Sequence, residues 1–213
     1  MTSSPRDGFT LVELLVVIAI IGVLAGLGSK MLSFAMKSSS IGLAEQEMQR
    51  LVLGVETYQL DFGDYPPSSM EKDYEISGNG LDEGNESLVA HLASRSRGRS
   101  YFEFKEEFLE NLDQDRLRNA DLYQQMRWVF GDDQLREYVD PWGVPYVYIH
   151  NRDYGIEYSV TQETGPVKIQ AGTSLKTATF HEPLRFQIWT AGPDGIHQMH
   201  TDEAADSDDV APW

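Results

Sequence analysis

The sequence GFTLVELLVVIAIIGVLAGL, residues 8–27, is a run of apolar side chains that one acidic residue, Glu13, interrupts. Residues 9–27 span about 28 Å as a helix, close to the thickness of the hydrocarbon core of a bilayer. A carboxylate near one end of such a segment costs up to about 3 kcal/mol on insertion scales, so its presence needs a reason. The pattern predicts a membrane-spanning helix in which Glu13 has a particular role.

A short polar leader, MTSSPRDG, precedes this run. An ordinary secretory signal has its small-residue cleavage site after the apolar stretch, whereas Gly8 comes before it. The stretch resembles the N-terminal cleavage and methylation motif of type IV pilins and of the pseudopilins of type II secretion. The resemblance implies that prepilin peptidase cuts between Gly8 and Phe9, that Phe9 is then N-methylated, and that residues 1–8 are a cytoplasmic leader. Asp7 departs from the second basic residue usual in the family, while Arg6 and the Gly-Phe junction agree with it.

The predicted cleavage gives Glu13 a partner. It creates an ammonium group at Phe9, four residues and about one helical turn from the carboxylate. Glu13 can pair with that group in its own chain or, as the resemblance implies, with the terminus of a neighbouring subunit during assembly. Either pairing offsets the cost of the charge in lipid. An ordinary signal anchor with an incidental glutamate is the alternative.

Helical spacing of apolar residues continues beyond the apolar run. The residues on this stripe are Ile41, Ala44, Met48, Leu51, Val52, Val55 and Tyr58. Because no proline occurs between residues 9 and 62, we expect one near-continuous helix, with 9–27 in the membrane and 28–63 outside it. The stripe faces either the protein's own sheet or a neighbouring helix in a filament. Gly63 and the two prolines of YQLDFGDYPP (58–67), which resembles the pseudopilin pattern Y-x-x-D-x-G-x-Y-P, end the helix.

The rest of the chain predicts a variable insert followed by a sheet. Helical segments are expected in the insert, 64–139, at 86–94, 102–112 and 115–130. YVDPWGVPY (138–146) resembles a pseudopilin signature and suits a turn, with Trp142 fixing it to the core. Strand-like runs follow at 145–151, 154–161, 167–171, 175–180 and 184–191. The expected fold is α+β and pilin-like: a long N-terminal helix packed on an antiparallel meander within 140–193.

The final segment, 194–213, is acidic. Six of its residues are aspartate or glutamate and none is lysine or arginine. Oxygen-rich loops of this kind bind Ca²⁺. The segment resembles the calcium loop of major pseudopilins, G-x-D-G followed by D-[IV]-x-x-W. The resemblance implies ligands from Asp194, Asp209 and the Ala191 carbonyl, with Asp202, Asp206 and Asp208 as further candidates. A solvated acidic tail is the alternative, and a Zn²⁺ site at His197 and His200 lacks a third ligand.

Composition narrows the partners and the function. The net charge of −17 disfavours nucleic acid and anionic membrane surfaces, and the absence of cysteine excludes disulfides and thiolate metal sites. No common hydrolase, P-loop or zinc-protease motif is present, so we expect no enzymatic activity.

The resemblance implies a pseudopilin with a defined location and defined partners. It is anchored by a single pass in the bacterial inner membrane, with its N-terminus in the cytoplasm and its C-terminal domain in the periplasm. Through its helix it polymerises with copies of itself and other pseudopilins, on the inner-membrane secretion platform, into a periplasmic pseudopilus. The alternatives are a type IV pilin or minor pilin of an adhesion or DNA-uptake machine and, from another class, a membrane-anchored enzyme or binding domain.

Overall fold

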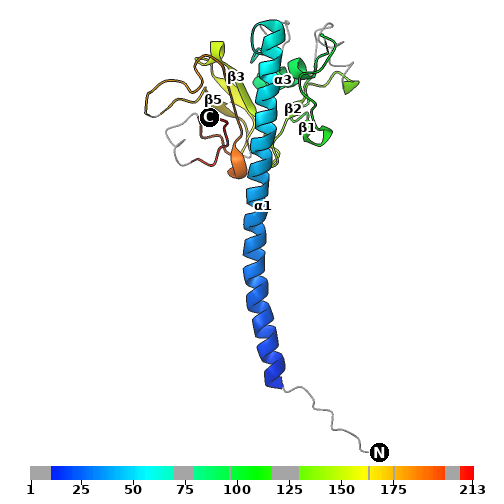
Figure 1. The fold of residues 1–213 in the computed structure, drawn as a ribbon, viewed down its shortest axis with the longest axis vertical. Helices are drawn as coiled ribbons and strands as arrows, with labels where there is room; N and C mark the ends of the chain where they lie inside the picture. The colour runs from blue at the N-terminus through cyan, green and yellow to red at the C-terminus, as the bar shows by residue number, and fades with distance from the viewer. Residues whose placement is uncertain are drawn as a thin grey trace, which may run out of the picture. The chain divides into compact units, whose positions relative to one another are not determined.

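The computed structural model describes residues 11–69, 79–95, 97–116, 130–162, 164–174, 176–199 and 207–213 (Figure 1). The chain divides into two compact units, Met1–Ser39 and Ser40–Trp213. Helix α1 (Leu11–Phe62) begins in the first unit and ends in the second. The large apolar side chains of residues 11–21 are exposed, from 46% at Val17 to 81% at Leu11.

Within the described part of the chain, no helix combines the length and the apolar character needed to cross a membrane. The membrane span expected at 9–27 stays a prediction.

In the second unit, α1 presents the predicted apolar stripe to the protein's own core. Ala44, Met48, Leu51, Val55 and Tyr58 are all buried. Most of these side chains share one hydrophobic cluster with residues of α3 and with strand residues. Figure 1 shows the cyan part of α1 between α3, β1 and β2 on one side and β3 and β5 on the other. Of the two partners that the sequence left open for this stripe, the protein's own core is therefore the one observed.

The end of α1 is the one that the sequence predicts. Gly63 adopts φ +81°, and its N–H donates to the carbonyl of Gln59 at 2.8 Å. This left-handed conformation is accessible to glycine at little cost, so the residue ends the helix and satisfies one of its last carbonyls. Pro66 and Pro67 follow in non-helical chain, and proline cannot continue the helix.

The insert is only partly helical. Helix α3 (Glu83–Ala93) confirms the segment expected at 86–94, although it starts three residues earlier. The helix expected at 102–112 is wrong: this stretch holds the 3₁₀ turn η1 (Glu106–Phe108) and strand β1 (Leu109–Glu110). β1 pairs antiparallel with β2 (Glu137–Tyr138). Most of the segment expected at 115–130 lies outside the described residues.

Aromatic packing explains why 102–112 is extended. The rings of Phe102, Phe104 and Phe108 lie 5.7, 5.0 and 6.2 Å from the ring of Tyr138, measured between centroids. Residues 102 and 104 can share one neighbour because alternate side chains of an extended chain point the same way. Contacts among these four rings outweigh the helix propensity of the intervening charged residues.

The sheet is not the predicted meander. Strand β3 (Val147–His150) pairs antiparallel with β6 (Phe186–Trp189), and β4 (Tyr158–Val160) pairs antiparallel with β5 (Val167–Ile169). Among the described residues the strands therefore form three two-stranded sheets, counting β1 with β2. Residues 176–180 contribute a single bridge, between Thr173 and Phe180, in place of the strand expected at 175–180.

The β3–β6 pair is buried on both faces. Phe186 and Ile188 face the cluster that contains α1 and α3 residues, whereas Trp189 faces a second cluster with β4, β5 and Trp213. This division follows from the alternation of side chains along a strand. The described chain is thus α+β, with a buried strand pair between two hydrophobic clusters.

Candidate functional site

The predicted cation loop starts directly after β6. The 3₁₀ turn η3 (Gly192–Asp194) follows Ala191, which is fully buried. Backbone hydrogen bonds of 3.0 Å join Thr190 and Val210 in both directions. This bridge brings the neighbouring Asp209 back to the end of β6, although nineteen or so residues separate the two segments.

Gly192 makes the close return of the chain possible. Its φ is +67°, and a Cβ atom built on it would lie 2.1 Å from the carbonyl oxygen of Asp208. A side chain here would be strained by the backbone and would collide with the C-terminal segment. The glycine of the G-x-D-G pattern therefore has a steric role in this structure.

Asp209 is held by two backbone hydrogen bonds. Its Oδ2 accepts the N–H groups of Gln198 at 2.8 Å and Met199 at 2.5 Å. Its Oδ1 is buried and has no hydrogen-bond partner among the described residues. Burial, together with the charges of Asp194 and Asp208, raises the pKa of Asp209 to about 6, against the effect of the two backbone hydrogen bonds.

The structure places some predicted loop residues and not others. Asp194 lies in η3, where its Oδ1 accepts the N–H of Ile196 at 2.8 Å. Asp202, Asp206 and His200 lie outside the described residues. Asp208, another of the candidates, lies beside Gly192 and contributes to the raised pKa of Asp209. The clustered donors are oxygen atoms, which suit a hard cation such as Ca²⁺ better than Zn²⁺.

The turn after β2 is hydrogen-bonded to Thr190, directly before this loop. The Oδ1 atom of Asp140 accepts the N–H groups of Trp142 at 2.8 Å and Val144 at 3.0 Å. Its Oδ2 accepts the hydroxyl of Thr190, the residue that pairs with Val210. Trp142 itself is only partly buried, so the expectation that it fixes the turn is wrong. The buried carboxylate of Asp140 does so, because it can accept several hydrogen bonds at once.

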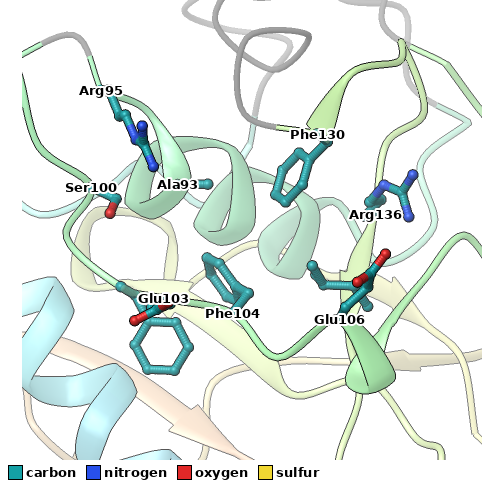
Figure 2. Close-up of a pocket in the computed structure, with 10 residues that line it drawn as sticks. Ala93, Arg95, Ser100, Glu103, Phe104, Glu106, Phe130 and Arg136 are labelled. Atoms are coloured by element: carbon teal, nitrogen blue, oxygen red, sulfur yellow. The ribbon is translucent and has the colours of Figure 1, made fainter.

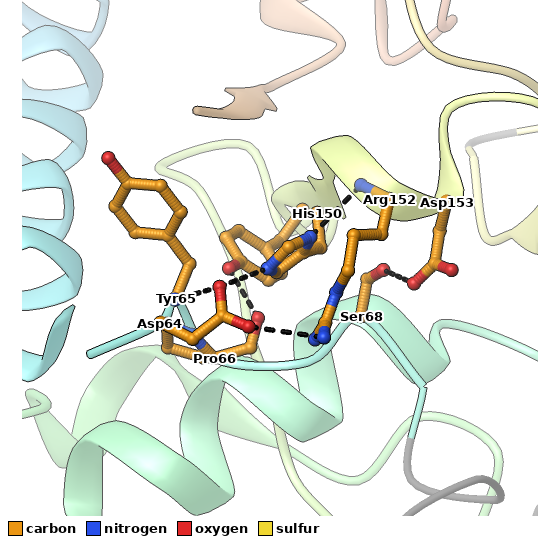
Figure 3. A network of polar contacts seen from close by, with 8 residues as sticks. Asp64, Tyr65, Pro66, Ser68, His150, Arg152 and Asp153 are labelled. Carbon is orange, nitrogen blue, oxygen red and sulfur yellow. Dashed lines mark hydrogen bonds and ion pairs between the residues drawn. The ribbon is translucent and has the colours of Figure 1, made fainter. Parts of the chain in front are cut away.

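A second polar network joins the end of α1 to β3 (Figure 3). Asp64 accepts the Nε2–H of His150 at 3.0 Å and forms an ion pair with Arg152 at 3.1 Å. Nearby, Ser68 donates to Asp153 at 2.8 Å, and the Tyr148 hydroxyl donates to the carbonyl of Pro66 at 2.6 Å. These contacts give the segment after α1 the structural role expected from its sequence.

His150 is held in one protonation state by this network. The backbone N–H of Arg152 donates to its Nδ1 at 3.0 Å, so Nδ1 is an acceptor and Nε2 carries the proton. Burial lowers the pKa of His150, although its hydrogen bond to Asp64 opposes the change. Partial burial alone would raise the pKa of Asp64, but hydrogen bonds from His150 and the Tyr65 N–H lower it.

A cavity of about 310 Å³ lies beside α3 and β1. Figure 2 shows the rings of Phe104 and Phe130 between the guanidinium groups of Arg95 and Arg136. Glu103 and Glu106 also line it, so the charges balance. The lining therefore has no net preference for an anion or a cation.

The predicted processing site is at the other end of the chain. Gly8 and Phe9 lie outside the described residues. Glu13 lies in the first turn of α1 and is exposed.

Comparison with known proteins identifies this end of the chain. Residues 4–29 match the family model described as the prokaryotic N-terminal methylation motif. No curated protein and no solved structure matches the chain. The motif indicates a type IV pilin-like prepilin signal, and hence a substrate of prepilin peptidase that assembles with pilin-like subunits in the cell envelope. It does not distinguish a pseudopilin from a type IV pilin.

Proposed function

We propose that this protein is a pseudopilin, a subunit that polymerises through its N-terminal helix into a periplasmic filament driving type II secretion. The methylation motif at residues 4–29 is the observation that carries the pilin-like part of this proposal. The peptidase removes residues 1–8, Phe9 becomes the methylated N-terminus, and the apolar helix stays in the inner membrane. Assembly, and not catalysis, is the activity of the chain.

Glu13 and the apolar side chains around it have complementary roles in assembly. The large apolar side chains of residues 11–21 are exposed and offer a packing surface to neighbouring helices in lipid. The Glu13 carboxylate pairs with the N-terminal ammonium group of Phe9 in an adjacent subunit. In lipid each of these charges is costly alone, and the attraction between them offsets that cost only when the two groups are in contact. The pairing therefore selects one axial register between neighbouring helices.

Two sequence blocks favour a pseudopilin over a pilin. The D-P-W-G turn holds Thr190 through Asp140, and the G-P-D-G turn brings Asp194 near Asp209. These blocks resemble those of major pseudopilins, and here they form connected parts of one structure. A type IV pilin or minor pilin is the second candidate, because the methylation motif fits both classes equally.

We also propose that the C-terminal loop binds Ca²⁺. The Ala191 carbonyl, Asp194 and Asp209 would hold the ion, with Asp202 and Asp206 as further candidates. Asp209 fits this role because its Oδ1 is buried without a hydrogen-bond partner in the described chain. Bound Ca²⁺ supplies positive charge to a segment that has none, and so fastens the C-terminal segment to β6.

Mass spectrometry of the protein purified from its native membrane tests the function. We expect the loss of residues 1–8 and one added methyl group on Phe9. An intact Met1 would show that the chain is not processed as a prepilin. Deletion of the gene then separates the two machines: loss of secreted proteins from the medium indicates a pseudopilin, whereas loss of surface pili with normal secretion indicates a pilin.

A further inference from the structure

A group of acidic side chains lies in the insert and shares no residue with the C-terminal loop. Glu86 belongs to α3, Asp113 to the segment after β1, and Glu137 to β2. Carboxylate oxygens of these three residues lie within 4.8 Å of one another. The β1–β2 pairing contributes to this arrangement, and the N–H of Leu112 donates to Oε2 of Glu137 at 2.9 Å.

The two glutamates are buried without the partners that a buried carboxylate needs. Glu86 is 1% exposed and Glu137 is 0% exposed. Both carboxylate oxygens of Glu86 and the Oε1 atom of Glu137 have no hydrogen-bond partner among the described residues. Each such oxygen costs about 1–3 kcal/mol, and more when the group is charged. A proton shared between neighbouring carboxyls, a buried water or a cation can satisfy these oxygens.

Three further side-chain oxygen atoms in the same region also lack a hydrogen-bond partner within the described ranges. Oδ1 of Asn111 and both carboxylate oxygens of Asp115 are buried and have no hydrogen-bond partner in the described chain. Residues 111, 113 and 115 alternate in the sequence, as do the first ligands of a calcium-binding loop. Gln114, between two of them, has φ +63°, so the loop turns sharply around this group.

The protein does not neutralise these acids with its own described cations. Arg116 pairs with Asp133 at 3.2 Å, and Arg136 pairs with Asp132 at 2.6 Å. No lysine or arginine of the described ranges forms an ion pair with Glu86, and burial followed by the charge of Asp115 raises the pKa of Glu86. A cation from solution would relieve both the repulsion and the missing hydrogen bonds.

We propose that Asn111, Asp113 and Asp115, together with Glu86 and Glu137, form a Ca²⁺ site that fastens the insert to α3. The donor set contains only oxygen, which favours a hard cation over Zn²⁺. Ca²⁺ accepts six to eight oxygen ligands in flexible geometry, whereas Mg²⁺ retains several waters. Because both glutamates are buried, the site has little room for water and favours Ca²⁺, which protein oxygens can hold, over Mg²⁺.

The experiment uses the full-length protein in detergent micelles, stripped with EDTA and titrated with CaCl₂ by calorimetry. Asp209→Asn is introduced first, so that the C-terminal loop does not contribute. In this background we expect one remaining Ca²⁺ site and a higher melting temperature with Ca²⁺ than with EDTA. Adding Glu86→Gln should lower the Ca²⁺ affinity at least tenfold, whereas Glu107→Gln, the same change at an exposed residue of η1, should leave it unchanged.

Two checks distinguish a loss of the Ca²⁺ site from a loss of folding. Glu86→Gln should melt in EDTA at or above the temperature of its parent, because the amide removes a buried acid without changing its shape. Asp113→Asn, at a half-buried position, gives a second variant that should also lose Ca²⁺ affinity. The proposal is overturned if Asp209→Asn alone abolishes Ca²⁺ binding, if both cluster variants retain full affinity, or if Mg²⁺ raises the melting temperature as much as Ca²⁺ at equal concentration. The first result would leave the proposed C-terminal site standing.

Discussion

Replacing Gly192 by alanine tests the close contact between η3 and the C-terminal segment. The new Cβ atom would lie 2.1 Å from the carbonyl oxygen of Asp208, so the two must separate by about 1 Å. That movement breaks the paired backbone hydrogen bonds between Thr190 and Val210. It also separates Asp209 from the end of β6, where the proposed Ca²⁺ ligands meet.

Two costs determine the expected loss of stability. A residue with a Cβ in the left-handed region costs about 1 kcal/mol, and two backbone hydrogen bonds contribute roughly 1 kcal/mol each. The free energy of unfolding should therefore fall by about 3 kcal/mol. For a unit of this size, that corresponds to a melting temperature lower by roughly 6–12 °C.

Gly143→Ala is the matched control. Gly143 has φ +86°, but a Cβ built there meets nothing within 4 Å, so only the backbone cost of about 1 kcal/mol applies. Thermal unfolding of both variants, followed by tryptophan fluorescence in EDTA, makes the comparison without bound metal. Equal melting temperatures for the two variants would refute the steric role of Gly192.

Three other outcomes follow from individual residues. Glu13→Ala should leave cleavage after Gly8 intact, by mass spectrometry, while reducing sedimentable filaments; unimpaired assembly would contradict its role in register. Glu47→Ala should lower the free energy of unfolding by roughly 2 kcal/mol. The buried Glu47 carboxylate accepts the Tyr138 hydroxyl at 3.0 Å and forms ion pairs with Arg50 and Lys105. Thermal unfolding measures the loss, with Glu45→Ala at an exposed position as the control. The lowered pKa of His150 means that the folded state binds fewer protons than the unfolded state just below pH 6.5, so stability present above that pH is lost as the pH falls. Melting temperatures at pH 7.5 and 5.5 should show a smaller decrease for His150→Gln than for the wild type, and equal decreases would contradict the protonation state described.

The successes of the sequence predictions concern local patterns. The apolar stripe of α1 was recovered because residues three and four apart share a helix face whatever surrounds it. Gly63 was recovered as the end of α1 because a left-handed glycine followed by prolines stops a helix locally. The same reasoning located α3.

The failures concern contacts between distant segments. Residues 102–112 contain good helix formers, but the ring of Tyr138 and the pairing of β1 with β2 hold them extended. Likewise, β3 pairs with β6 instead of with the next strand. No local spacing records such a choice, because its free energy comes from side chains that meet only in the folded chain.

The candidate sites divide in the same way. The methylation motif is a linear signal, so the sequence of residues 4–29 is enough to identify it. The acids of the C-terminal loop were visible in the sequence, but the approach of Asp209 to the end of β6 depends on the Thr190–Val210 bridge. The acidic group in the insert could not be predicted from the sequence, because Glu86 and Glu137 are 51 residues apart and belong to no motif. Only tertiary structure buries them together, and burial is what makes an unpartnered carboxylate costly enough to require a ligand.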